Sequence, residues 1–149
     1  MDDGGDLTVY EDERFTVAHE AGCAVPGYLI VRLKDGSTSY GDLAPEAAQA
    51  LGTLLARAVR AIEAAVGADR VYVLTFAELD RRLHVHLFPR APWLLEAYWR
   101  ATGSRERPVN GPALFEWARA TFAAGCALPP GAGSVAEACA ALRERLRGR

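Results

Sequence analysis

The segment RLHVHLFPR, residues 82–90, decides how this chain is interpreted. Apolar and polar side chains alternate along it, which is typical of a β-strand with one buried face. The leucines and the valine are expected to face the core, whereas His84 and His86 share the opposite face, about 7 Å apart along the strand. Arg82 lies one step upstream on the same face. The pattern therefore predicts a row of three basic side chains on one strand.

The composition is that of one globular domain. The chain has 149 residues, half of them hydrophobic and 24% charged, so it can bury a core without disulfide bonds. Its net charge of −2 argues against a nucleic-acid-coating protein, which needs a basic excess. No apolar run reaches the roughly 20 residues of a membrane helix. Three cysteines without a CxxC pair, and an acidic N-terminus without an apolar core, favour a reducing cytoplasm.

The segments around residues 82–90 predict an α+β fold. Short strands are expected over residues 7–10, 15–19 and 28–33. A further strand over residues 70–78 is followed so closely by the strand over residues 83–88 that a parallel crossover does not fit between them. The last two strands are therefore expected to pair as an antiparallel hairpin.

One long helix is predicted near residues 44–66. Asp42 can cap its N-terminus, Pro45 suits its first turn, and Gly67 can end it. Ser134, with glutamate three residues later, fits the capping box of a C-terminal helix. Three shorter helices are predicted over residues 93–99, 112–124 and 134–147.

Three interpretations of the two histidines are open from their spacing alone. They can belong to a solvated polar face. They can supply two ligands to a zinc ion, although no third ligand is apparent. They can also carry phosphoryl chemistry, because a neutral imidazole is nucleophilic near neutral pH, and a second imidazole with an arginine can stabilise charge on phosphate oxygens.

Residues 84–90 resemble the signature of the histidine triad (HIT) superfamily, His-φ-His-φ-His-φ-φ, often followed by Pro-Arg, where φ is apolar. Aligned on the Pro-Arg pair, His86 is the third histidine of the triad, His84 is the middle one, and Arg82 stands at the first position. A second register would make His86 the middle histidine and place Phe88 at the third position. The Pro-Arg pair favours the first register.

The resemblance covers residues 7–90 of a single domain, 1–149. An acidic tail is expected over residues 1–6, and residues 91–149 are expected to form a helical C-terminal extension that the resemblance does not match. The resemblance implies a strongly curved antiparallel sheet of about five strands, with one long central helix and extra C-terminal helices. Its other pieces are VYEDERF at 9–15, PGYLIV at 26–31, DLAPEAA at 42–48 and GAD at 67–69.

The resemblance also implies a nucleotide-conjugate hydrolase or nucleotidyl transferase. In the family the middle histidine attacks the α-phosphorus to give a covalent nucleotidyl-histidine, a role that falls to His84, while His86 contacts phosphate oxygens. The implied partner is a nucleotide or its conjugate, above all an adenylated small molecule, and many members are homodimers. No cofactor is required, although a divalent cation can accompany a polyphosphate. Further candidates are Arg82 and Arg90 for phosphate binding, Glu78 and Asp80 for proton transfer, and Phe15, Ile30 and Trp93 for a nucleoside pocket.

The chain departs from the family pattern at Arg82, at the loop near Gly36 and in the segment 75–81, which lacks the family's Gly/Gln/Ser-rich phosphate loop. Arg82 is a permanent cation, so it can neutralise phosphate but does not exchange protons at ordinary pH. A further histidine, expected in the loop near Gly36, is absent. These departures leave a non-catalytic nucleotide-binding module as the alternative function.

Overall fold

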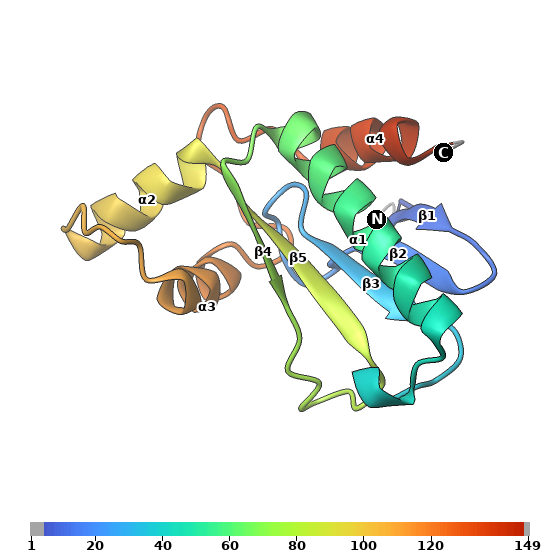
Figure 1. Cartoon of the computed structure of the whole chain (residues 1–149). Helices are drawn as coiled ribbons and strands as arrows, with labels where there is room; N and C mark the ends of the chain where they lie inside the picture. The colour runs from blue at the N-terminus through green and yellow to red at the C-terminus, as the bar shows by residue number, and fades with distance from the viewer. Residues whose placement is uncertain (1–4, 148–149) are drawn as a thin grey trace.

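The computed structural model describes residues 5–147 and has the α+β fold that the sequence predicts. Within these residues five antiparallel strands form one sheet, in the order β1-β2-β3-β5-β4 (Figure 1). Residues 1–4 of the expected acidic tail lie outside the described part. The strands are β1 (Thr8–Glu11), β2 (Phe15–His19), β3 (Leu29–Leu33), β4 (Arg70–Leu74) and β5 (His84–Arg90). The helices are α1 (Pro45–Val66), α2 (Pro92–Thr102), α3 (Gly111–Thr121) and α4 (Val135–Leu146), with a short 3-10 helix, η1 (Tyr40–Asp42).

Each face of the sheet has its own apolar core. On one face, Val31, Val85 and Leu87 pack with α1 and α4. On the other face, Ile30 and Phe88 pack with α2 and α3. Figure 1 shows α1 crossing the sheet with α4 near it, while α2 and α3 are grouped to the left of β4. β5 contributes to both cores, so its side chains are strongly constrained on each side.

α1 closely matches the helix predicted at residues 44–66. Pro45 is its first residue, and Gly67 follows it with a φ of 66°, a left-handed conformation that commonly ends helices. The expected N-cap is wrong: Asp42 ends η1, and Ala44 precedes α1 without a side-chain hydrogen bond. The helix lays one apolar stripe on the sheet. Its buried side chains are Ala47, Leu51, Leu54, Ala58, Ala61 and Ile62.

β4 and β5 form the predicted hairpin, but their lengths differ from the prediction. The sequence ends the second strand before Pro89, because proline cannot donate a hydrogen bond to a sheet. In the structure β5 continues to Arg90, since β3 pairs with it only as far as Leu87 and β4 alone accompanies Pro89. Proline is tolerated in a strand that has a neighbour on one side. β4 ends earlier than predicted, at Leu74.

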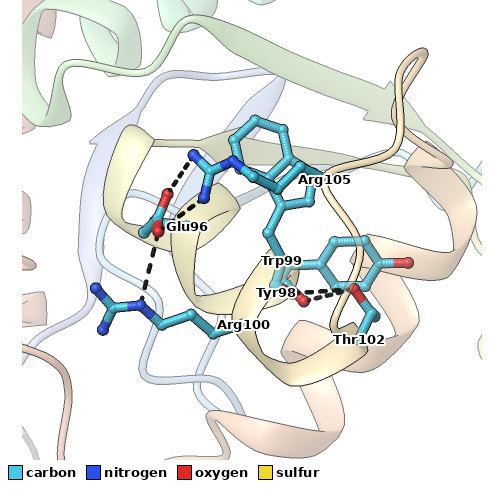
Figure 2. Close-up of polar contacts among 6 residues, drawn as sticks. All are labelled: Glu96, Tyr98, Trp99, Arg100, Thr102 and Arg105. Atoms are coloured by element: carbon cyan, nitrogen blue, oxygen red, sulfur yellow. Dashed lines mark hydrogen bonds and ion pairs between the residues drawn. The ribbon is translucent and has the colours of Figure 1, made fainter.

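The three C-terminal helices form as predicted, and Arg105 fastens the segment between α2 and α3 to α2. Its guanidinium donates hydrogen bonds to both carboxylate oxygens of Glu96, at 3.1 and 3.0 Å, and its central carbon lies 4.5 Å from the ring centroid of Trp99 (Figure 2). Arg100 contacts the same carboxylate at 3.6 Å. Ser134 caps α4 by accepting a hydrogen bond from the Glu137 N–H at 3.1 Å.

The loop between β2 and β3 is held by His19, whose exposed fraction is 3%. Its Nδ1–H donates to the carbonyl of Glu20 at 3.0 Å, and its Nε2 accepts from the N–H of Gly27 at 3.1 Å. Burial lowers the pKa of His19, which keeps the ring neutral and able to accept this hydrogen bond. His19 is therefore a structural histidine that positions the start of β3.

Gly27→Ala is expected to lower the free energy of unfolding by about 1–3 kcal/mol. Gly27 has a φ of 93°, and a Cβ there would lie 3.0 Å from Cγ1 of Val66. Gly52→Ala is the matched control, because Gly52 is exposed within α1 with nothing within 4 Å of an added Cβ. The control is expected to gain about 0.5–1 kcal/mol. Urea unfolding measures both changes, and equal values for the two variants would contradict the prediction.

Candidate active site

His84 and His86 project from one face of β5, as the alternation predicts. Val85, between them, is buried in the core on the α1 side of the sheet. The centroids of the two imidazole rings lie 5.2 Å apart, and both side chains are half-buried. The strand thus presents two adjacent imidazoles, which we call the histidine pair.

β3 supplies the cross-strand neighbours of the histidine pair. Arg32 is opposite His84 in the antiparallel register, and Ile30 is opposite His86. Directly opposed residues share a face of the sheet, with Cβ atoms about 4.5–5.5 Å apart. Arg32 is exposed and Ile30 is buried. β3 therefore places a cation beside His84 and an apolar floor beside His86.

The proton position on His84 follows from one hydrogen bond. Its Nδ1 lies 2.7 Å from the carbonyl oxygen of Arg82. A carbonyl only accepts hydrogen bonds, so Nδ1 carries a proton. In the neutral ring Nε2 then holds a lone pair. His84 consequently has its nucleophilic nitrogen at the end of the ring away from the backbone.

His86 lies deeper against the second core. A hydrogen bond of 2.7 Å joins its Nδ1 to the hydroxyl of Tyr28, and the two ring centroids lie 5.9 Å apart. Burial lowers the pKa of His86 to about 4, and the charges of His84 and Arg119 lower it further in the same direction. The imidazole of His86 is therefore neutral at physiological pH.

α3 forms a wall beside the histidine pair. The ring of Phe115 lies 6.2 Å from that of His86, nearly perpendicular to it. One turn further along α3, the guanidinium carbon of Arg119 lies 5.3 Å from the Phe115 ring centroid. Within residues 5–147 neither Arg32 nor Arg119 forms an ion pair. Two cations without carboxylate partners in this part of the chain thus flank the pair.

Arg82 contacts the histidine pair through its backbone carbonyl, while its side chain binds Asp80. The guanidinium is bound to Asp80 by hydrogen bonds of 3.0 and 2.9 Å and is 71% exposed. The hydrogen bonds from Arg82 lower the pKa of Asp80 to about 2, so Asp80 carries no proton at neutral pH. Glu78 is exposed in the same loop. Of these residues, the Arg82 carbonyl alone has a hydrogen bond to the histidine pair within the described chain.

The remaining candidates lie apart from the histidine pair. Arg90 stands at the other end of β5, about 20 Å from His84 along the strand, with its guanidinium paired to Asp69 at 3.2 Å. Phe15 belongs to the core on the opposite face of the sheet. Trp93 packs against Phe122, with the ring centroids 5.4 Å apart. Among the expected nucleoside-pocket residues, Ile30 is therefore the one beside a histidine.

Four residues of the site were absent from the sequence-based candidates: Tyr28, Arg32, Phe115 and Arg119. Tyr28 and Arg32 lie on one face of the predicted strand 28–33, because they are an even number of residues apart. Their place beside the histidines was hidden, because side-chain alternation does not reveal which strands are neighbours. Phe115 and Arg119 lie on a helix with no motif to mark it.

The described chain offers no ready metal site and no membrane span. Within residues 5–147, no three side chains of histidine, cysteine, aspartate or glutamate gather closely enough to hold a metal ion. No helix in the same residues is both long and apolar enough to cross a bilayer.

Comparison with known proteins shows which solved structures have a similar fold. No protein-family model matches the sequence, and no curated protein sequence matches it significantly. Among solved structures, a hypothetical histidine triad nucleotide-binding protein from Sulfolobus tokodaii aligns with 58% of this chain, at 25% identity and a TM-score of 0.54. The chain spans 62% of the length of that protein.

Two further structures extend the likeness over nearly the whole chain. A histidine triad protein from Bradyrhizobium japonicum covers 96% of this chain, and 92% of its own, at 17% identity and a TM-score of 0.63. A zinc-bound histidine triad family protein from Mycobacterium smegmatis covers 95%, and 84% of its own, at 20% identity and a TM-score of 0.58. These alignments include most of residues 91–149. The chain has the fold of the histidine triad proteins, and the predicted resemblance is confirmed.

The stability contributed by His86 is expected to fall as pH decreases from about 6.5, the ordinary histidine pKa. Its folded pKa of about 4 means that the folded protein binds fewer protons between these values. The contribution is complete above pH 6.5 and is lost as pH falls towards 4. Urea unfolding at several pH values should show the free-energy difference between wild type and His86→Gln declining through this window. A difference independent of pH would contradict the prediction.

Proposed function

We propose that the chain binds a nucleotide conjugate at the histidine pair and transfers or hydrolyses it at the α-phosphate. The observation that carries the proposal is the hydrogen bond from His84 Nδ1–H to the Arg82 carbonyl, because it leaves the lone pair on Nε2. A neutral imidazole with a free Nε2 is a suitable nucleophile near neutral pH. His84 is accordingly the attacking residue.

The proposed reaction has two steps. The lone pair of His84 Nε2 forms a bond to the α-phosphorus, and the bond from phosphorus to the leaving group breaks with its electron pair going to the leaving group. Water, or another acceptor, then attacks the same phosphorus, releases the histidine and loses its proton to solvent. The covalent intermediate is a nucleotidyl-histidine, and hydrolysis yields a nucleoside monophosphate.

Similarity to the Sulfolobus tokodaii protein supports a nucleotide ligand. That protein is described as nucleotide-binding, and its fold is shared by this chain. The two flanking arginines are consistent with a ligand that carries phosphate, since guanidinium groups bind phosphate oxygens strongly. Adenylated small molecules are the substrates we favour, as the sequence resemblance implies.

A non-catalytic nucleotide-binding module is the second candidate, and one observation favours it. Asp80 is held as a carboxylate by Arg82 and cannot donate a proton at neutral pH. Asp80 thus provides no acid to assist a leaving group, and Arg82, at the first triad position, does not exchange protons at ordinary pH. In this alternative the site binds the nucleotide without turnover.

The proposal includes a homodimer, a cytoplasmic location and a reaction without a required cofactor, in which a divalent cation can accompany a polyphosphate. β4 is an edge strand, and it and the loop after it expose three large apolar side chains: Val73 at 50%, Phe76 at 74% and Leu79, which is fully exposed. An exposed edge strand is a template for pairing with another chain. This edge supports the dimer.

His84→Ala is expected to slow AMP release from adenosine phosphoramidate or diadenosine tetraphosphate by at least about a thousandfold, because the nucleophile is lost. Rapid acid-free quenching should trap labelled nucleotide on wild type and on His86→Ala but not on His84→Ala. A covalent species that persists in His84→Ala would favour the register with His86 as nucleophile. Binding without AMP release by wild type would favour the non-catalytic module.

Arg32→Ala and Arg119→Ala are each expected to weaken nucleotide binding about tenfold, as loss of a hydrogen bond to a charged group does. Arg60→Ala is the control, because Arg60 is exposed on α1, which packs on the other face of the sheet. Titration calorimetry with AMP measures the three dissociation constants. Equal constants for Arg32→Ala and Arg60→Ala would show that the arginine beside His84 does not contact phosphate.

A further inference from the structure

Tyr28 lies beneath the histidine pair, and the reaction described above does not use it. Its side chain has no exposed surface, and its ring packs edge-on against Phe88 and Phe115, with centroids 5.1 and 6.1 Å away. Gly27, just before it, is held by His19. The tyrosine ring is thus buried in an aromatic core, and its hydroxyl lies 2.7 Å from Nδ1 of His86.

The direction of this hydrogen bond follows from the surroundings of the hydroxyl. Within residues 5–147, Nδ1 of His86 is the one hydrogen-bond partner of the Tyr28 hydroxyl. If Nδ1 donated, the hydroxyl proton would be left without an acceptor in an apolar core, which is strongly unfavourable. Burial also raises the pKa of Tyr28, so the hydroxyl keeps its proton. The hydroxyl therefore donates, and Nδ1 of His86 accepts.

We propose that Tyr28 is a positioning residue that holds His86 in the tautomer with its proton on Nε2. The two members of the histidine pair then present opposite groups at the same ring position. His84 offers the lone pair of Nε2, whereas His86 offers an Nε2–H. Each tautomer is set by what the Nδ1 atom contacts: a carbonyl for His84 and a tyrosine hydroxyl for His86.

The role of His86 in catalysis rests on the proposed function. The Nε2–H tautomer makes that role more specific. A neutral imidazole that donates from Nε2 can stabilise negative charge on a non-bridging phosphate oxygen. Its proton stays on the ring, because losing it would create an imidazolate. His86 is therefore a hydrogen-bond donor to the phosphate and not the acid that protonates the leaving group.

Long-range proton–nitrogen NMR of histidine-labelled protein at neutral pH tests the assignment directly. The structure predicts an Nδ1–H tautomer for His19 and His84 and an Nε2–H tautomer for His86 alone. In Tyr28→Phe, the His86 signals are expected to lose their Nε2–H character. An Nδ1–H tautomer for His86 in wild type, or an unchanged spectrum in Tyr28→Phe, would overturn the proposal.

Tyr72→Phe is the matched control. Tyr72 belongs to the same apolar core, and its buried hydroxyl has no hydrogen-bond partner in the described chain. Its substitution should leave all three histidine spectra unchanged. If Tyr28→Phe does not fold, the wild-type spectrum alone still decides the tautomer of His86.

An activity measurement separates this inference from the proposed function. If the enzyme turns over, Tyr28→Phe should slow formation of the covalent intermediate about tenfold, as expected for one weakened hydrogen bond, whereas Tyr72→Phe should not. If wild type shows no turnover, the proposed function fails, and the NMR spectrum still tests the tautomer. Full activity in Tyr28→Phe with a mixed His86 tautomer would remove the catalytic role of Tyr28.

Discussion

The pairing of β3 with β5 is the constraint on which the site depends. Val31 opposes Val85 and Leu29 opposes Leu87, and all four side chains are buried under α1. A shift of one residue would turn these side chains outward and drive the histidine pair into the apolar core. The hydrophobic effect on one face of the sheet therefore fixes which residues meet on the other. The same register sets Arg32 beside His84.

The second constraint is the hydrogen-bond partner of Nδ1 in each imidazole, because this partner sets the tautomer of the ring. A carbonyl oxygen determines the proton position on His84, and the Glu20 carbonyl does the same for His19. The acceptors are backbone carbonyls, which every residue has, so no sequence motif predicts these hydrogen bonds. A histidine count or a triad signature does not distinguish a nucleophile from a structural ring. The contact at Nε2 does, because the Gly27 N–H occupies the lone pair of His19, whereas no hydrogen bond within residues 5–147 occupies that of His84.

Local patterns carried much of the fold and only part of the candidate site. The long helix, the hairpin and the face shared by His84 and His86 were each predicted from the spacing of residues within a short stretch of the sequence. The spacing of residues did not reveal that Arg82 and Asp80, which have opposite charges and are close in sequence, form an ion pair with each other. Neither side chain is therefore free for a substrate. Arg90 lies on the same face of β5 as His84, but at the opposite end of the strand. The contribution of α3 depends on tertiary packing that no local pattern specifies.

The turn at Gly27 links a remote histidine to the chemistry of the sheet. Its N–H is bound by His19, and the next residue is the tyrosine that contacts His86. A proton added to Nε2 of His19 would direct two N–H groups at each other and push this turn open. Acid strong enough to protonate His19 can thus disturb the site indirectly, by displacing the turn that precedes Tyr28.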